Sequence, residues 1–268
     1  MNNLRICLYK LLAATCLLVL LTGTSHGFND NAHERLTRRA VGDPLLPNSS
    51  QLNIFLIDNL GYDFPQGINE PIDGGPNVVG LIAKGAVKED YPDSRVLNHF
   101  HDPTQPWNSA GLFLFTGRYM SSIEWSQLLT PQPYGETRTW KTARDAYFKA
   151  LTSTTVAQRK QWFRETFFTV GHLIHHVQDA AVPAHTRNDN HFALFGQFPA
   201  GDRFHFWAEN NLDVIDQSIQ QSGILRYSPS LLEQASPNKY APLPIARIID
   251  STDGNLGTLS YGLNIGLA

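Results

Sequence analysis

The residues best suited to chemistry lie between Gly171 and His185, where histidine and aspartate recur at close spacing. His175 and Asp179 are four residues apart, so on a helix both side chains project from one face, about one turn from each other. An imidazole and a carboxylate placed in this way can share one metal ion, and imidazole is a ligand that zinc prefers. His185 follows the break at Pro183 and can approach the same place. We therefore predict a metal centre here.

A second pair with the same spacing, His205 and Glu209, follows later in the chain. Ten histidines is a high number for 268 residues. Two such pairs, with a loop histidine between them, indicate more than one ion. The alternatives without a metal ion are a simple hydrogen bond between the residues of the first pair and a solvent-exposed polar pair for the second. Four other histidines flanked by aromatic or apolar residues are expected to be ordinary core or surface residues: His101, His172, His176 and His191.

The elements that must position these residues are helices. Residues 156–182 form a long predicted helix with an apolar stripe, and His172, His175 and Asp179 lie on an adjoining face. A helix that is apolar nearly all round, with one polar stripe, is expected to lie in the core with that stripe facing something ionic. Further helices are predicted from a cap at Asp30 or Asn31 to the prolines at 44 and 47, and over 49–60, 78–87, 138–153 and 202–221.

Residues 110–129 also show some helical spacing, and strand signals are few. We therefore predict an all-α fold, a single multi-helix domain over residues 28–268, in which the segment after about residue 225 has no defined element. The size and the 42% hydrophobic content are ordinary for one globular domain.

The first 27 residues have the pattern of a secretory signal peptide. Arg5 and Lys10 precede an apolar run, and small residues precede a cleavage site after Gly27. Both cysteines, Cys7 and Cys16, lie in this segment, so the mature chain would contain no disulfide or thiolate site. We expect a secreted or periplasmic monomer without a transmembrane segment. The net charge of −3 indicates no basic surface for nucleic acid.

In the order and spacing of these residues, the chain resembles the zinc-dependent phospholipase C and S1/P1 nuclease family. Members of that family are secreted helical phosphodiesterases with three zinc ions. Asn98-His99-Phe100-His101-Asp102-Pro103 is similar to the Ser-His-Phe-Tyr-Asp-Pro motif of the phospholipases. The resemblance covers residues 28 to about 213, and its metal ligands map in order onto Phe28, His33, Asp90, His99, His175, Asp179, His185, His205 and Glu209.

The resemblance divides these ligands among three ions. One zinc would be held by Asp90, His99, His175 and Asp179. A second would be held by the amino nitrogen and carbonyl oxygen of Phe28, by His33 and by the bridging Asp179. The third would be held by His185, His205 and Glu209. Asp90 would act as the catalytic base. The family's first residue is normally tryptophan, and here it is phenylalanine.

The resemblance also bears on the substrate. Tyr91 follows the first aspartate, as in the choline pocket of the phospholipases, and Asp30 can serve as the pocket's acid. Val96 stands where that pocket has phenylalanine, and Asp93 stands where the nucleases have arginine. We therefore expect a phospholipase C that contacts a membrane surface transiently. An S1/P1-type single-strand nuclease is less expected, and a non-catalytic, metal-stabilised binding module is the other alternative.

Overall fold

A computed structural model describes residues 28–42, 47–114, 117–188, 203–214 and 217 of the chain. Over this part the protein is a mostly helical domain, as the sequence predicts. Its elements, in chain order, are α2 (Asp30–Gly42), α3 (Pro47–Leu60), η1 (Gly67–Asn69), α4 (Val78–Lys88), η2 (Asp93–Asn98), η3 (Trp107–Ser109), β1 (Phe113–Leu114), β2 (Gly117–Arg118), α5 (Ser122–Gln127), α6 (Trp140–Thr152), α7 (Val156–Asp179), α8 (Pro183–Thr186) and α9 (Arg203–Asn210).

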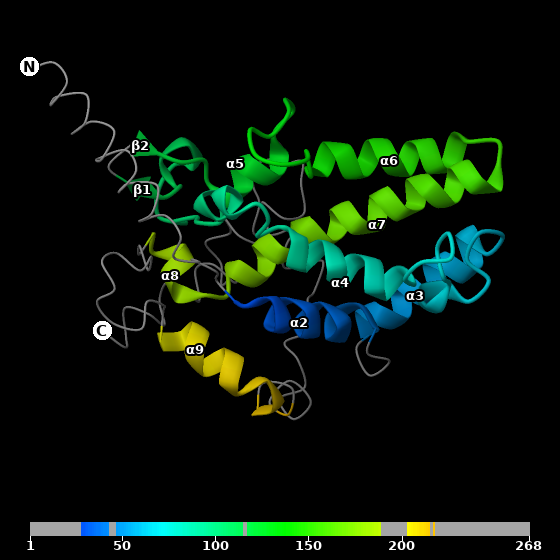
Figure 1. Ribbon diagram of the computed structural model, residues 1–268, viewed down its shortest axis with the longest axis horizontal. Helices are drawn as coiled ribbons and strands as arrows, with labels where there is room; N and C mark the ends of the chain where they lie inside the picture. The colour runs from blue at the N-terminus through cyan, green and yellow to red at the C-terminus, as the bar shows by residue number, and fades with distance from the viewer. Residues whose placement is uncertain (1–27, 43–46, 115–116, 189–202, 215–216, 218–268) are drawn as a thin grey trace, which may run out of the picture.

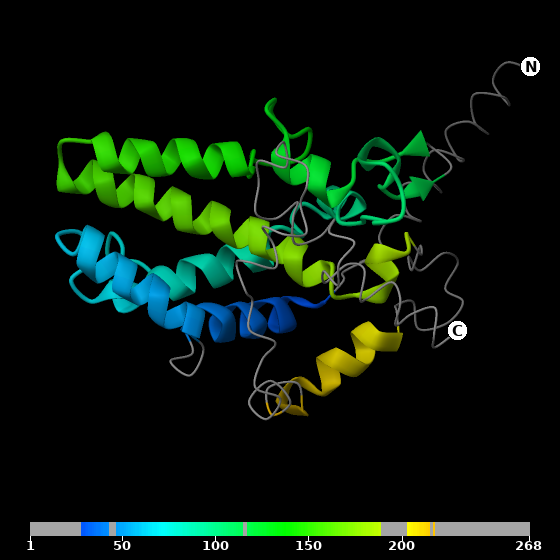
Figure 2. The ribbon, with the colours of Figure 1, turned by 180° about the vertical axis from the view of Figure 1, so that it is seen from behind.

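The long helix α7 lies between α6 and α4 (Figure 1). The reverse view in Figure 2 shows the same neighbours, with α2 packed along α4. The side chain of Thr155 caps α7 by accepting a hydrogen bond from the backbone nitrogen of Gln158. Phe163 and Phe167 are buried in the main core, on the apolar stripe that the sequence predicts. The N-terminal half of α7 therefore anchors the fold, and its C-terminal half is left to carry polar residues.

α4 and α7 cross with their backbones almost in contact at Gly85 and Gly171. A Cβ atom on Gly85 would lie 2.0 Å from the carbonyl oxygen of Phe168, and one on Gly171 would lie 2.1 Å from the carbonyl oxygen of Ile82. Because glycine has no Cβ, it alone permits so close an approach. The crossing sets the end of α4, and Glu89 just after it, against the histidine-bearing turns of α7.

Several predicted helix ends differ from the observed ones: α6 begins at Trp140, and α9 ends at Asn210. α7 ends at Asp179 rather than at Val182, which is extended (φ −88°, ψ 116°) because it precedes Pro183. The cap of α2 lies one residue earlier than predicted, since the side chain of Asn29 accepts a hydrogen bond of 2.8 Å from the backbone nitrogen of Ala32.

The helical expectation for residues 110–129 is largely wrong. The segment begins with β1 and β2, which pair antiparallel with Phe113 opposite Arg118, and becomes helical only in α5. α5 begins with a capping box, in which Ser121 and Glu124 each bond the other's backbone nitrogen. Strands of two residues are too short to show an alternating pattern, which is why the sequence did not predict them. Likewise, Pro47 begins α3 instead of closing the helix before it.

A small apolar cluster joins the start of the described chain to α8 and α9. It contains Phe28, Ala32, Val182, Ala184 and Ala208, with Phe204 packed against it. This packing fixes residue 28 beside the C-terminal end of α7. None of the described helices has the length and apolar character needed to span a bilayer. The predicted signal peptide, residues 189–202 and residues 218–268 lie outside the described part of the chain.

Candidate metal centre

The structure brings six of the nine predicted metal ligands into one buried cluster. They come from the first turn of α2, the segment after α4, the residue after η2, the last turns of α7, and α8. All six are at most 1% exposed. We call them the Asp179 cluster: His33, Asp90, His99, His175, Asp179 and His185.

Asp179 lies at the centre of this cluster. Its Oδ2 atom is 3.0 Å from Nδ1 of His99 and 3.1 Å from Nε2 of His175. The same oxygen is 3.3 Å from Nδ1 of His185, and Oδ1 is 3.5 Å from Nε2 of His33. None of these contacts has hydrogen-bond geometry at Asp179, and Nε2 of His33 has no hydrogen-bond partner either. A buried carboxylate without hydrogen bonds is costly, and a cation between these atoms would offset the cost.

Asp90 approaches the same place from the end of α4. Its Oδ1 atom is 3.4 Å from Nδ1 of His99 and 3.5 Å from Nε2 of His175. These two ring nitrogens are themselves only 3.1 Å apart. Two imidazole nitrogens so close together must share either a proton or an ion. The arrangement therefore offers two nitrogens and at least one carboxylate oxygen to a single cation.

Hydrogen bonds on the outer side hold two of these imidazoles in place. Nδ1 of His175 is 2.7 Å from the carbonyl oxygen of Ala86, so it carries a proton and leaves Nε2 facing the cluster. Nδ1 of His33 is 2.6 Å from Oε1 of Gln178, whose amide nitrogen donates to the hydroxyl of Thr37. The amide is thereby oriented with its oxygen toward His33. Outer partners of this kind accompany metal-bound histidines.

The cluster also shifts the proton affinities of its members. Burial lowers the pKa of His175, but attraction by Asp179 and Asp90 outweighs burial and raises this pKa to about 10. Burial raises the pKa of Asp179, yet His175 and His185 hold it well below its usual range. Burial and the neighbouring charge of His175 lower the pKa of His33 to about 3. Without a metal ion, the cluster thus draws a proton into its centre, at the place a cation would take.

The structure gives less information on the three remaining predicted ligands, Phe28, His205 and Glu209. Phe28 is buried, with its ring 5.7 Å from that of His33, so the expected first residue of the mature chain lies beside the cluster. Glu209 accepts a hydrogen bond of 2.6 Å from the side chain of Asn29. The side chain of His205 lies outside the described atoms, and His185 is described beside Asp179. The grouping of His185, His205 and Glu209 around a separate ion stays a prediction.

The two predicted substrate-binding residues contact each other near the surface. The hydroxyl of Tyr91 donates to Oδ2 of Asp30 at 3.0 Å, and this bond raises the pKa of Tyr91. Tyr91 is 44% exposed, so it can meet a ligand. The ammonium nitrogen of Lys88 lies 4.5 Å from the centroid of the same ring. A cation of the chain itself therefore already occupies one face of the predicted headgroup pocket.

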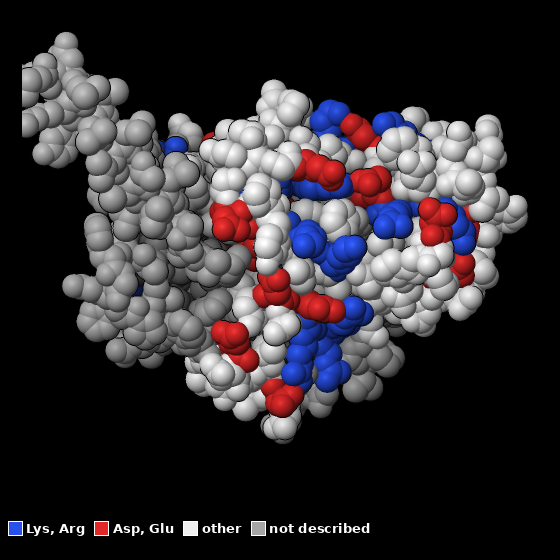
Figure 3. Space-filling model, in the orientation of Figure 1, with Lys and Arg blue, Asp and Glu red and all other residues white. Residues whose placement is uncertain are grey.

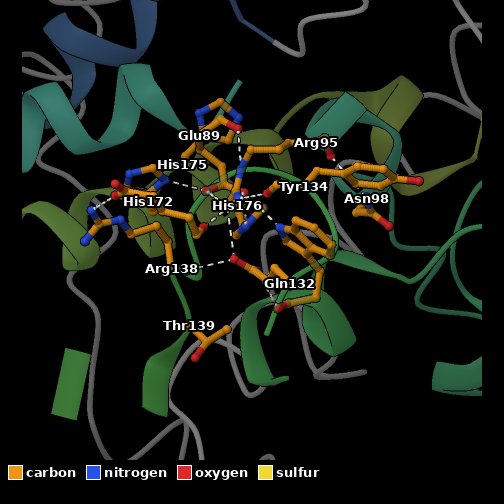
Figure 4. A network of polar contacts seen from close by, with 12 residues as sticks. Glu89, Arg95, Asn98, Gln132, Tyr134, Arg138, Thr139, His172, His175 and His176 are labelled. Atoms are coloured by element: carbon orange, nitrogen blue, oxygen red, sulfur yellow. Dashed lines mark hydrogen bonds and ion pairs between the residues drawn. The ribbon is translucent and has the colours of Figure 1, made fainter. Parts of the chain in front are cut away.

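Sequence reasoning missed a second buried cluster on the other side of His99. Its centre is Glu89, whose carboxylate accepts hydrogen bonds from Arg95, Trp125 and His172 and faces His176 at 3.3 Å. We call these residues the Glu89 cluster, and Figure 4 shows Arg95, His172 and His176 gathered around Glu89. The sequence signal was the run Lys88-Glu89-Asp90, which carries two acids and does not show which of them faces the predicted ions.

The expectation that His172 and His176 are ordinary core residues is correct in that both are buried, but both are polar neighbours of Glu89. His101 is buried too, and its backbone nitrogen donates to the carbonyl oxygen of His185 at 2.9 Å. His101 thereby joins the loop after η2 to α8. His191 lies outside the described residues.

Among the described residues, three overlapping groups have ligand atoms close enough to share an ion. Two belong to the Asp179 cluster: His33 with His175 and Asp179, and Asp90 with His99 and His175. The third is Glu89 with His99 and His176. The donor set of nitrogen and oxygen atoms suits zinc and similar ions.

Comparison of the chain with protein-family models, with curated proteins and with solved structures found no significant match. The family resemblance therefore rests on the residues and their spacing. The structure adds a mostly helical fold in which buried histidines and carboxylates form groups that can hold metal ions.

Proposed function

We propose that the protein is a secreted zinc-dependent phosphodiesterase of the phospholipase C kind. Two zinc ions would lie in the Asp179 cluster, one held by Asp90, His99, His175 and Asp179 and the other by Phe28, His33 and Asp179. A third ion, held by His185, His205 and Glu209, follows from the family resemblance alone.

The observation that carries the proposal is the carboxylate of Asp179. Both of its oxygens are buried, both lack hydrogen bonds, and four imidazole nitrogens face them at 3.0 to 3.5 Å. Because its two oxygens face different histidines, Asp179 is suited to bridge two cations. A structural zinc site is usually closed by four protein ligands, whereas the paired site that the resemblance implies would keep a position between the two ions open for water.

The residues of the cluster can support hydrolysis of a phosphodiester. Bound zinc lowers the pKa of water toward neutrality and offsets the negative charge of phosphoryl oxygens. Asp90 adjoins both His99 and His175, from where its carboxylate can accept a proton from an attacking water. His175 and His33 are held by hydrogen bonds from their Nδ1 atoms to Ala86 and Gln178, so these two ligands need little reorganisation when substrate binds.

Three observations support phospholipid as the substrate class. Tyr91 and Asp30 form one exposed unit next to Asp90, which suits a positively charged headgroup. The acid Asp93 follows where a nucleic-acid enzyme of the family would have arginine. On the face shown in Figure 3, basic side chains lie among acidic ones, a mixture that does not favour a polyanion. A transient membrane contact belongs to the same proposal.

The deciding experiment compares two substrates on the mature protein that begins at Phe28. A chromogenic phosphatidylcholine analogue and single-stranded DNA are each assayed with zinc and after chelation. The Asp179→Asn variant is the test, and Asp145→Asn is the matched control, since Asp145 is an exposed partner of Lys141 on α6. We expect zinc-dependent hydrolysis of the phospholipid analogue that is lost in Asp179→Asn and kept in Asp145→Asn.

Two other outcomes would contradict the phospholipase activity. Zinc-dependent cleavage of DNA without lipid hydrolysis would make the protein a nuclease. Protein that is loaded with zinc but turns over neither substrate would contradict the enzymatic role and favour a metal-stabilised binding module.

A further inference from the structure

The carboxylate of Glu89 is buried and held by several hydrogen bonds. Oε1 accepts from Nη2 of Arg95 at 2.8 Å and from Nε1 of Trp125 at 2.8 Å. Oε2 accepts from the same Arg95 nitrogen at 2.6 Å and from Nδ1 of His172 at 2.5 Å. A carboxylate has about four lone-pair positions, and three donor groups already share them, with one nitrogen of Arg95 bonded to both oxygens. Glu89 is therefore poorly suited to bind an ion itself.

The guanidinium of Arg95 cannot turn away from Glu89. Its Nε atom donates to the backbone oxygen of Glu89 at 3.1 Å, and Nη1 donates to the carbonyl oxygens of Tyr134 and Glu136 at 2.8 and 3.0 Å. Arg95 is 1% exposed, and the side chain of Gln132 accepts a further bond from Nη2. Figure 4 shows this network around Glu89. The position of the Glu89 carboxylate is thus fixed from several elements at once.

The ring of His99 lies between this fixed carboxylate and the Asp179 cluster. Its Nε2 atom is 3.7 Å from Oε1 of Glu89 and has no hydrogen-bond partner. Its Nδ1 atom, on the opposite side of the ring, faces Asp179 and Nε2 of His175 at 3.0 and 3.1 Å. A histidine that binds a metal through one nitrogen commonly donates its other N–H to a carboxylate. For His99 that carboxylate is Glu89, whose Oε1 at 3.7 Å comes within hydrogen-bond distance of Nε2 after a small shift of the ring.

We propose that Glu89 is a positioning residue: it holds His99 with a proton on Nε2, so that Nδ1 is the atom offered to the metal. His175 and His33 are held the other way round, because their Nδ1 atoms face Ala86 and Gln178. The centre would then bind through Nδ1 of one histidine and Nε2 of two others. This inference rests on the metal-binding part of the proposed function and is independent of hydrolysis.

The competing arrangement puts an ion between Glu89, His99 and His176, whose ligand atoms are also close together. That ion would have to displace the hydrogen bonds of Trp125 or Arg95, leaving a buried donor unpaired. It would also take Nε2 of His99 in place of Nδ1. The two arrangements therefore predict opposite coordinating nitrogens on one ring.

NMR spectroscopy of the ¹⁵N-histidine-labelled mature protein, loaded with ¹¹³Cd²⁺, distinguishes them. Long-range proton–nitrogen correlations report the protonated nitrogen of each ring, and His99→Gln and His175→Gln variants assign the signals. We expect cadmium coupling to Nδ1 of His99 and to Nε2 of His175 and His33. Coupling to Nε2 of His99 or to His176 would overturn the inference, and so would a protein that binds no cadmium.

Substitution of Glu89 gives an independent test. In chelator competition, Glu89→Gln should weaken zinc affinity about 10- to 100-fold, the range typical of lost outer partners, and Glu89→Asp should restore part of it. The ligand-field spectrum of the cobalt-substituted protein should change as well. Glu165→Gln, on the partly exposed partner of Arg138, is the matched control. Unchanged affinity and spectrum in a folded Glu89→Gln protein would contradict the positioning role.

If Glu89→Gln does not fold, the NMR pattern of the wild-type protein decides the matter alone. The outcomes also separate this inference from the proposed activity. A protein with the expected coordination that hydrolyses no phosphodiester contradicts only the enzymatic function. A protein that hydrolyses phospholipid while His99 coordinates through Nε2 contradicts only the role of Glu89.

Discussion

Two buried carboxylates lie on either side of His99, and they differ in how they are satisfied. Glu89 accepts four hydrogen bonds and forms an ion pair with Arg95. Asp179 is equally buried but accepts none, and its neighbours are four histidines, of which His33 and His175 have their outer nitrogens hydrogen-bonded. The comparison teaches that burial of a charge does not by itself mark an ion site. An ion site is indicated when buried acceptor atoms remain without a hydrogen-bond donor from the protein.

The same difference shows in two consecutive histidines of α7. Attraction by Asp179 and Asp90 overcomes burial and raises the pKa of His175 to about 10. Burial dominates for His176 and lowers its pKa to about 4, although Glu89 lies nearby. Arg95 already balances the charge of Glu89, so little is left to attract a proton to His176. One cluster behaves as a site that needs a cation, and the other as a closed structural unit.

The largest effect is expected from Asp179→Asn. One carboxylate would serve two ions, so its loss should lower the zinc content by more than one ion per chain and abolish hydrolysis. Elemental analysis after gel filtration measures the content, with Asp145→Asn as the control. Full zinc stoichiometry in Asp179→Asn would contradict the bridging role.

Breaking the Glu89 cluster should lower stability, in addition to the weaker zinc affinity that the positioning role of Glu89 predicts. Glu89→Ala leaves Arg95 buried without its partner, which typically costs about 3–5 kcal/mol. We expect this loss in urea unfolding both with zinc and with chelator present. His172→Ala removes one of the four bonds and should be milder, with full zinc content. If His172→Ala lost a zinc ion, His172 would be a metal ligand, and the two clusters would not have separate roles.

The crossing of α4 and α7 supports both clusters, so its disruption should affect both. Gly171→Ala would push a methyl group against the backbone of α4, and overpacking of this kind costs about 1–3 kcal/mol. We expect a lower melting temperature together with weaker zinc binding. Lys84→Ala, at an exposed position of α4, is the control. A protein that keeps both properties after Gly171→Ala would show that the helices can separate without cost.

Binding of metal should release protons from the Asp179 cluster. The pKa of His175 is raised to about 10 in the ion-free protein, so at neutral pH its ring carries a proton that a metal must displace. Apparent zinc affinity should therefore rise with pH through the neutral range and level off near pH 10. Calorimetry in buffers of different ionisation enthalpy counts the protons. Zinc uptake with no proton release would contradict this account of the cluster.

The smallest effect is expected at the surface. Lys88 lies over the ring of Tyr91, where a positively charged headgroup would bind. Lys88→Ala should lower the KM for a phosphatidylcholine analogue by about two- to fivefold, since exposed cation–π contacts are worth about 0.5–1 kcal/mol, and leave kcat unchanged. Lys84→Ala again serves as the control. A higher KM would mean that Lys88 itself binds the substrate.

The sequence predicted the helical fold and the pairing of His175 with Asp179 because both depend on local spacing. The family resemblance also selected His33, Asp90, His99 and His185, which the structure brings to the same place. The sequence could not predict the Glu89 cluster. Trp125 and His172 are 36 and 83 residues from Glu89, and no local pattern shows that they meet.

The reason for that meeting is the contact of Gly85 with Gly171, a tertiary feature that two isolated glycines do not reveal. The short hairpin of β1 and β2 escaped prediction for a related reason, since two-residue strands carry no periodic signal. The sequence therefore indicates candidate ligands that are close together along the chain. The residues that hold those ligands in place are identified only by the fold.

The most direct test of the metal centre is zinc K-edge X-ray absorption, with elemental analysis, on the mature protein that begins at Phe28. We predict at least two zinc ions per chain, bound only by nitrogen and oxygen at about 2.0–2.2 Å, with outer-shell scattering from imidazole. The signal should fall sharply in Asp179→Asn and persist in Asp145→Asn. Folded wild-type protein that contains no metal after equilibration with zinc would contradict the account.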